Sequence, residues 1–251
     1  MLSNEERCVL RRHQVAEVIC QFRFPEILII GTNPPAQFQE MIRDTFPLYS
    51  VRKEQPPMGN DQPAVLNHQF STADNRYRVN LTAGFISLSC NQYTRWEDFA
   101  QMLDKPLAAF IQTYMPVYFT RIGLRYLNFI SRRELALEGI PFSELIEPYY
   151  LGPLAEIDVN ESTVSRCTVD AQLALSNNCT LKVHAGPGMV KRNNTPSNEL
   201  HFIFDQDLFK KGNIPINIST ATLNTLHRNA YNVFRGAITD QLFQAMEPES
   251  T

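Results

Sequence analysis

The chain has 251 residues, of which 43% are hydrophobic and 20% are charged, a composition that excludes a wholly disordered or collagen-like protein. Its 23 lysines and arginines against 26 aspartates and glutamates leave a formal charge of −3. A strongly basic nucleic-acid-binding protein is therefore disfavoured as a description of the whole chain, although a local basic face remains compatible with this charge.

The first part of the chain is predicted to form a strand, a helix and a meander. The strand at 15–24 alternates apolar and polar residues. The helix at 34–46 has Asn33 as its expected N-cap. The Pro- and Gly-rich stretch 54–63 is expected to be a loop. The short strands of the meander are predicted near 49–53, 64–71, 76–82 and 85–91.

A long helix and a long strand follow the meander. The helix is expected to begin after Thr94 as its cap, with Glu97 completing a capping box, and to end before Pro116. Its apolar residues recur at helical spacing: Trp96, Phe99, Leu103, Leu107, Phe110 and Tyr114. The strand at 117–130 is long and rich in aromatic residues. This helix and strand complete a first lobe over residues 1–132.

An irregular connector is predicted at 133–162, with a short helix near 142–147. The second lobe, 163–251, begins with three strands and closes with a long helix. Its predicted elements are strands at 163–175, 179–185 and 199–205, a loop at 186–198 and a helix at 219–246. We therefore expect an α+β fold of two lobes of mainly antiparallel sheet, each backed by a long helix, with the alternative of one continuous domain.

The amino-terminal residues and the cysteines favour a reduced, cytoplasmic setting. The first residues carry charges of both signs and lack the apolar core of a signal peptide. Apolar runs such as Ile27–Ile30 are far shorter than the ~20 residues that span a bilayer, so we expect no membrane association. The five cysteines form no CxxC pair, and their odd number leaves at least one free thiol.

Several separated segments together resemble one protein family. They are Ala16–Val18 with Phe22–Pro25, Trp96–Glu97 with Phe99, Arg121–Asn128, and the last helix with Leu223, Leu226–His227, Phe234 and Ile238–Asp240. This family is distributed sporadically among bacteria and archaea, and its members are about as long as this chain. The resemblance implies no assigned activity, cofactor or catalytic residue. The patchy distribution suggests a mobile or defence-related gene context.

Arginines on predicted strands form the first candidate site. Arg121 and Arg125 point the same way, about 13 Å apart on one strand, with Gly123 between them. If the strands are neighbours, several guanidinium groups converge, and their planar forks suit phosphate. The alternative is a structural network in which Glu17 pairs with Arg121 or Arg125. The candidates for anion or nucleic-acid binding are Arg23, Arg76, Arg78, Arg121 and Arg125.

The last predicted hairpin offers a second candidate site. With the loop centred near residue 191, Lys182 lies across from His201 and His184 lies across from Glu199. Such a cluster could carry out acid–base chemistry without a metal, including RNA cleavage. The alternative is an exposed polar face with cross-strand ion pairs, and a slip of one residue disperses the cluster.

The sequence contains no Walker A, GxGxxG, HExxH or GxSxG motif, so we expect neither a cofactor nor a bound metal. The broad apolar stripe of the helix at 219–246 either packs on the chain's own sheet or docks a protein partner or a second copy. The sequence thus favours a non-enzymatic, cytoplasmic module that binds a protein partner. The alternative is an RNA- or nucleotide-phosphate-binding protein with weak, metal-independent ribonuclease activity.

Overall fold

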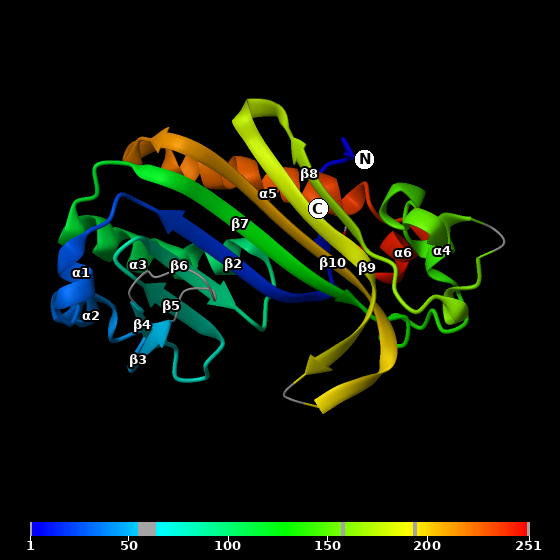
Figure 1. The fold of residues 1–251 in the computed structure, drawn as a ribbon, viewed down its shortest axis with the longest axis horizontal. Helices are drawn as coiled ribbons and strands as arrows, with labels where there is room; N and C mark the ends of the chain where they lie inside the picture. Colours follow the sequence, from blue (N-terminus) through cyan, green and yellow to red (C-terminus); the bar gives the residue numbers. More distant parts are fainter. Residues whose placement is uncertain (1, 55–63, 157–158, 193–194, 250–251) are drawn as a thin grey trace. The chain divides into compact units, whose positions relative to one another are not determined.

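The computed structural model describes residues 2–54, 64–156, 159–192 and 195–249 (Figure 1). These residues form a large antiparallel sheet, a small sheet and several helices, which confirms the predicted α+β class. The chain divides into unit 1, residues 1–16, 125–208 and 224–251, and unit 2, residues 17–124 and 209–223. The units interleave along the chain. The lobe boundaries expected after residues 132 and 162 stay a prediction.

Unit 2 contains the meander that the sequence predicts. β2 (Val15–Arg23) pairs antiparallel with β6 (Phe85–Cys90). From β6 the order runs through β5 (Tyr77–Leu81) and β4 (Val65–Ser71) to β3 (Leu48–Glu54). Each lies close to its expected bounds, although Glu54 belongs to β3 and not to a loop. The rest of the predicted loop, 55–63, lies outside the described residues.

The long helix of unit 2, α3 (Trp96–Tyr114), packs its apolar stripe against the sheet. The rings of Phe24 and Phe110 stack with their centroids 4.6 Å apart. The expected capping box is wrong, because Arg95 is the N-cap residue and makes no side-chain cap. The hydroxyl of Thr94 instead donates to Asp98 at 2.8 Å and accepts from Arg76 at 3.0 Å.

Two short helices replace the single helix expected at 34–46. They are α1 (Leu28–Thr32) and α2 (Ala36–Ile42). Asn33 is the C-cap residue of α1 and not an N-cap, since Pro35 takes that position before α2. α1 is not among the predicted elements, because Ile27–Ile30 has the pattern of a short apolar run without helical spacing. In α1 only Ile30 is buried, so this helix has no apolar stripe to recognise.

In unit 1 the strand order is β7 (Phe119–Ile130), β10 (Thr195–Ile214), β9 (Cys179–Arg192) and β8 (Val169–Ala174). β7 and β10 also extend into unit 2. The loop expected at 186–198 is wrong, because strand structure continues on both sides of residues 193–194. Glycine is required here, since a Cβ at Gly186 would lie 2.3 Å from the carbonyl oxygen of Cys167. It marks a close approach of two backbone segments within a strand.

Two helices replace the single helix expected at 219–246. α5 (Ser219–Arg235) ends before Gly236, and α6 (Asp240–Ala245) begins after Thr239, whose side chain accepts from the backbone of Leu242. The apolar stripe of α5 is buried, and Phe234 contacts Phe204 of β10 edge to face at 6.0 Å between centroids. The stripe packs within the chain, which is the first of the two alternatives predicted for it, so this buried face is not the surface that would dock a partner.

Shorter elements connect these parts. The predicted short helix is present as α4 (Phe142–Leu145). β1 (Val9–Leu10) pairs antiparallel with β11 (Pro248–Glu249). Single 3-10 turns occupy Pro148–Tyr150, Gly152–Ala155, Glu161–Thr163, Ser176–Asn178 and Ile216–Ile218. Within the described ranges, no helix combines the length and the apolar character needed to cross a membrane.

One order of elements occurs twice along the chain. A strand, short helices, a meander and a long helix follow one another from β2 to α3, and again from β7 to α5. In both cases the first strand neighbours the last strand of the meander that follows it. This recurrence is the pattern expected of a duplicated structural motif.

We expect Gly186→Ala to lower the free energy of unfolding by about 1–3 kcal/mol, because the added methyl group overlaps a backbone carbonyl that has little room to move. Gly84→Ala is the matched control, since a Cβ there meets nothing within 4 Å. Urea denaturation of both variants measures the difference. Equal stability of Gly186→Ala and the wild type would contradict the close approach of these segments.

Candidate functional sites

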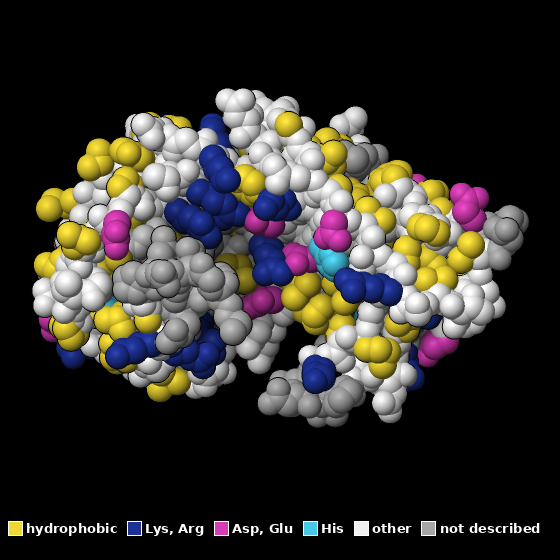
Figure 2. Space-filling view, viewed as in Figure 1, with side chains coloured by type: hydrophobic (Ala, Val, Ile, Leu, Met, Phe, Trp, Pro, Cys, Tyr) yellow, Lys and Arg dark blue, Asp and Glu magenta, His cyan; other side chains and the backbone are white. Residues whose placement is uncertain are grey.

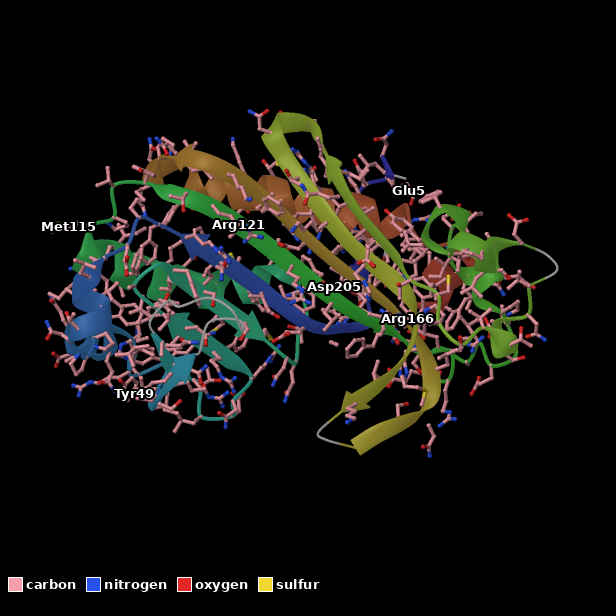
Figure 3. The ribbon with its side chains drawn as sticks, in the orientation of Figure 1. Glu5, Tyr49, Met115, Arg121, Arg166 and Asp205 are labelled. Atoms are coloured by element: carbon pink, nitrogen blue, oxygen red, sulfur yellow. The ribbon has the colours of Figure 1, made fainter. Side chains whose placement is uncertain are left out.

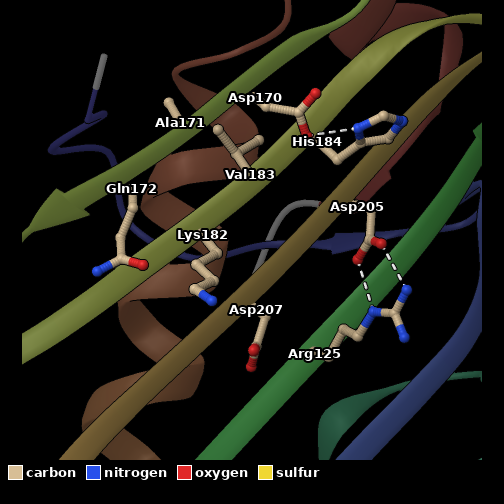
Figure 4. A pocket seen from close by; sticks show the side chains of 9 residues that line it. All are labelled: Arg125, Asp170, Ala171, Gln172, Lys182, Val183, His184, Asp205 and Asp207. Atoms are coloured by element: carbon tan, nitrogen blue, oxygen red, sulfur yellow. Dashed lines mark hydrogen bonds and ion pairs between the residues drawn. The ribbon is translucent and has the colours of Figure 1, made fainter. Parts of the chain in front are cut away.

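A polar pocket of about 510 Å³ lies on the sheet of unit 1 (Figure 4). Charged side chains from four neighbouring strands meet there, because alternate residues of each strand point to the same face. Its lining consists of Arg125 of β7, Asp170, Ala171 and Gln172 of β8, Lys182, Val183 and His184 of β9, and Asp205 and Asp207 of β10. Cationic and acidic groups thus occur together.

Arg125 forms a two-point ion pair with Asp205 inside this pocket. Its Nε donates to Oδ1 at 2.7 Å and its Nη2 donates to Oδ2 at 2.5 Å. The side chain of Asp205 is 18% exposed, so solvent screens the pair only in part. The bidentate geometry uses the fork of Arg125 that would otherwise bind a phosphate. Arg125 is therefore paired within the chain, and the partner that the structure shows is Asp205, whereas the structural alternative named Glu17.

His184 is held by Asp170 across the β8–β9 pair. The two residues are register partners, and Nδ1 of His184 donates to Oδ1 of Asp170 at 2.7 Å. Lys182 lies opposite Gln172 in the same register. A carboxylate that orients an imidazole is the arrangement used in general-base catalysis. His184 is 43% exposed, however, so little of the protein shields this pair from water.

His201 does not join His184 and Lys182, contrary to the prediction. It is buried, and its Nδ1 donates to the carbonyl oxygen of Glu199 at 3.0 Å. The pocket contains Asp205 and Asp207 instead of His201 and Glu199. The physical reason is the length of the strands: β9 extends to residue 192 and β10 starts at 195, so the hairpin turns later than residue 191.

Glu199 has a structural role near the end of β7. Burial raises its pKa, but hydrogen bonds from the backbone N–H of Arg133 at 3.0 Å and the hydroxyl of Ser131 at 2.9 Å outweigh burial and hold the pKa below its usual value. The nearby His201 adds to this lowering. Glu199 and His201 therefore stabilise the fold at this point, and they are not part of a reactive cluster.

A second group, here called the Arg121 cluster, lies on the sheet of unit 2 and comprises Arg23, Arg121, Lys211, Gln21 and Phe209. Nε of Arg23 and Nη1 of Arg121 donate to the same side-chain oxygen of Gln21, at 2.8 and 3.4 Å. The guanidinium of Arg121 lies 4.6 Å from the centroid of the Phe209 ring, and the ammonium of Lys211 lies 5.3 Å from it. Cations are therefore held beside an aromatic ring.

Gly123 leaves room for this arrangement. A Cβ at that position would lie 2.2 Å from Nη1 of Arg121, so the guanidinium rests directly over the glycine. Figure 2 shows lysine and arginine side chains gathered around the position at which Figure 3 labels Arg121. Phe209 and Lys211 are not among the predicted site residues, because the predicted strand ends at residue 205. The alternation of Phe209 and Lys211 after Asp205 and Asp207 is the signal that could have extended it.

Arg76 and Arg78 lie away from the Arg121 cluster. Nη2 of Arg76 donates to the hydroxyl of Thr94 at 3.0 Å, and its guanidinium lies 5.2 Å from the ring centroid of Tyr77. Arg78 is on β5, which is separated from β7 by β6 and β2. Three strand spacings amount to about 14 Å. The predicted convergence is thus present for Arg23 and Arg121 and wrong for Arg76 and Arg78.

The strand β3 forms an exposed edge of unit 2, at the end of the sheet order. All of its residues from 48 to 53 are exposed. They include three large apolar side chains: Leu48 is 44% exposed, Tyr49 43% and Val51 51%. An edge strand presents backbone N–H and C=O groups to solvent, and natural proteins usually avoid apolar residues there. This strand is not among the predicted sites, since edge and interior strands cannot be told apart in a sequence without the pairing order.

Tyr49 is held in place on this edge (Figure 3). Burial lowers the pKa of His68, which favours the neutral imidazole. Nε2 of His68 then donates to the carbonyl of Ile30 at 3.2 Å, and Nδ1 accepts from the hydroxyl of Tyr49 at 3.0 Å. The ring of Tyr49 also contacts Phe70, with centroids 5.2 Å apart. An exposed aromatic side chain with so many contacts is ordered before any ligand arrives.

Comparison with known protein families found no family model that matches the chain, and a search of curated proteins found no matching relative. In the part of the chain that the structure describes, no three His, Cys, Asp or Glu side chains are grouped as metal ligands would be. The three sites described above therefore have to be interpreted from their own chemistry.

A double-mutant cycle on Arg125→Ala and Asp205→Ala tests the internal pairing in the unit 1 pocket. We expect a coupling of about 1 kcal/mol in the free energy of unfolding, since the pair is bidentate but partly exposed. Urea denaturation of the wild type, both single variants and the double variant measures it. A coupling near zero would contradict a stabilising ion pair between Arg125 and Asp205.

Proposed function

We propose that the chain is a non-enzymatic binding module that recognises a protein partner through the edge strand β3. One observation carries this proposal. β3 ends the sheet with Leu48, Tyr49 and Val51 exposed, and no described strand pairs with its outer side. A partner segment in the extended conformation would add a strand there, with its backbone giving affinity and its side chains giving specificity.

The composition of β3 supports a specific interaction. Arg52 and Lys53 follow the apolar residues and are also exposed. Charged residues on an edge strand suppress indiscriminate pairing between sheets. The apolar residues at 48, 49 and 51 remain available to a partner strand that is apolar opposite them and compatible with the charges of Arg52 and Lys53. The apolar residues thus favour binding, and the charged residues restrict which partners can bind.

The mixture of charges in the unit 1 pocket disfavours RNA cleavage there, which supports a non-enzymatic role for the chain. Arg125 is paired with Asp205, His184 is paired with Asp170, and Asp207 also lines the pocket, so carboxylates lie among its basic side chains. A polyanion such as RNA would meet these carboxylates as well as the cations, which weakens electrostatic attraction. This balance disfavours the ribonuclease alternative for Lys182, His184 and His201. A cytoplasmic location and a mobile or defence-related gene context complete the proposal.

Val51→Lys should abolish capture of the partner, because it places a charge in the middle of the apolar edge. The matched control is Ala174→Lys on β8, the strand at the other end of the sheet order, where residue 174 is also exposed. Tagged wild type and both variants are purified from the native host, and the proteins that accompany them are quantified by mass spectrometry. A partner retained equally by Val51→Lys and Ala174→Lys would contradict docking at β3.

A specific observation favours a second candidate function, which is binding of a phosphate-bearing ligand such as RNA at the Arg121 cluster. Arg23 and Arg121 converge on one oxygen of Gln21, and Arg121 and Lys211 share the ring of Phe209. Phosphate oxygens could replace this amide oxygen as acceptors for both guanidinium groups. The ring would in turn present an apolar surface beside the phosphate.

Arg121→Ala or Lys211→Ala should weaken binding of a labelled single-stranded RNA about tenfold, since each removes a charge-assisted contact. Each substitution should also make RNA binding less dependent on salt: the slope of the logarithm of the binding constant against the logarithm of salt concentration should become about 0.7 less steep. Arg43→Ala is the control, because this exposed arginine pairs with Glu40 on the surface of the same unit. Fluorescence anisotropy measures all four proteins. Binding that is absent at low salt in the wild type would refute this candidate.

Turnover would contradict the non-enzymatic proposal itself. The same RNA is incubated with the wild type in the presence of EDTA and analysed for cleavage. Cleavage that His184→Ala abolishes would assign catalysis to the unit 1 pocket. We expect the RNA to remain intact.

A further inference from the structure

We propose that the occupant of β3 is a second copy of this chain, which pairs antiparallel with the same strand about a two-fold axis through Val51. This inference rests on the proposed function, because it names the partner of the same edge. A two-fold interface requires a surface that is complementary to itself. The sequence of β3 satisfies this requirement in one register.

The register through Val51 matches opposite residues well. Val51 faces its own copy, Ser50 faces Arg52, and Tyr49 faces Lys53. The two Val51 side chains therefore make an apolar contact on the axis. On either side of the axis the hydroxyl of Ser50 faces the guanidinium of Arg52, and farther out the ammonium of Lys53 faces the ring of Tyr49. Directly opposed residues have Cβ atoms about 4.5–5.5 Å apart, within reach of each of these interactions. No two like charges are opposed among residues 49–53.

Neighbouring registers are less favourable. An axis through Arg52 opposes two guanidinium groups, which repel each other. An axis through Ser50 pairs only residues 48–52 and leaves Lys53 without an opposite residue. The axis through Val51 uses the whole of β3, Leu48–Glu54. Charge complementarity and strand length thus select the same register.

The fixed position of Tyr49 favours this pairing. Its hydroxyl is bound to His68 at 3.0 Å, and its ring contacts Phe70, so little side-chain freedom is lost when Lys53 of a second copy approaches. Val65, which is 44% exposed on the neighbouring strand β4, widens the apolar surface at the end of the edge. Pairing of one short strand still buries a small area, so we expect a reversible dimer whose population depends on concentration.

The test measures the mass of the full-length chain in solution. Sedimentation equilibrium from micromolar to submillimolar concentration should show a monomer–dimer equilibrium for the wild type and for the control Ala174→Lys. Val51→Lys should remain monomeric, because it places two ammonium groups on the axis. Circular dichroism verifies that both variants are folded.

A cysteine at the axis tests the register. Under mild oxidation Val51→Cys should form a disulfide-linked dimer, since residue 51 faces its own copy. Ser50→Cys should give no more than the background of the wild type, whose own cysteines serve as the reference. Equal cross-linking at 50 and 51 would overturn the proposed register.

Failure of this inference is distinguishable from failure of the proposed function. A wild type that stays monomeric throughout, or a dimer that Val51→Lys leaves intact, would overturn the second copy as the occupant. If Val51→Lys nevertheless abolishes capture of a different protein from the host, β3 remains a docking strand. If Val51→Lys abolishes neither the dimer nor the capture of a host protein, both the proposed function and this inference are wrong.

Discussion

Side chains of an antiparallel sheet alternate between two faces, and in each unit of this protein a long helix covers one of them. The covered face must be apolar, because backbone and side chains there leave water together. Val18, Cys20 and Phe22 of β2 show this constraint, since all three are completely buried while Gln21 and Arg23 between and beyond them carry polar contacts. The candidate sites follow from what remains: the polar face, and the edge at which the pairing stops.

The polar faces of the two units differ in charge balance. In unit 1, carboxylates from β8 and β10 lie beside the cations, as the pairs His184–Asp170 and Arg125–Asp205 show. In the Arg121 cluster of unit 2, an amide oxygen and an aromatic ring hold the cations. The same alternation therefore produces a pocket of mixed charge in one unit and a group rich in cations in the other. The difference lies in the residues of the neighbouring strands.

Elements with a long and regular pattern could be predicted from the sequence. The strand β2 and the helix α3 are examples, because their apolar residues repeat at spacings of two and of three to four. The hairpin β9–β10 could not, because Gly186, Pro187 and Gly188 are residues typical of turns. Here the glycine serves a close approach to Cys167 inside a strand. The break between α5 and α6 was also missed, since the apolar residues on its two sides keep a helical spacing.

The candidate sites were harder to predict than the elements, because each depends on which strands are neighbours. Alternation placed Lys182 and His184 on one face, but only the β8–β9 register brings Asp170 to His184. A shift in the hairpin turn then exchanged His201 for Asp205 and Asp207 in the pocket. Pairing order is a property of the whole sheet, and a single strand does not encode it.

The same reasoning explains why the edge strand is the surface most suited to a protein partner. Residues on a sheet face are satisfied by neighbours on both sides, as Gln69 and Asn80 are when the amide of one donates to the other at 3.0 Å. On β3 the outer backbone groups have no such neighbour among the described strands, and its side chains at 48, 49 and 51 remain apolar. The exposed apolar area of these side chains adds nothing to the stability of the monomer, because it stays in contact with water. Their retention at the edge is accounted for if another strand covers them.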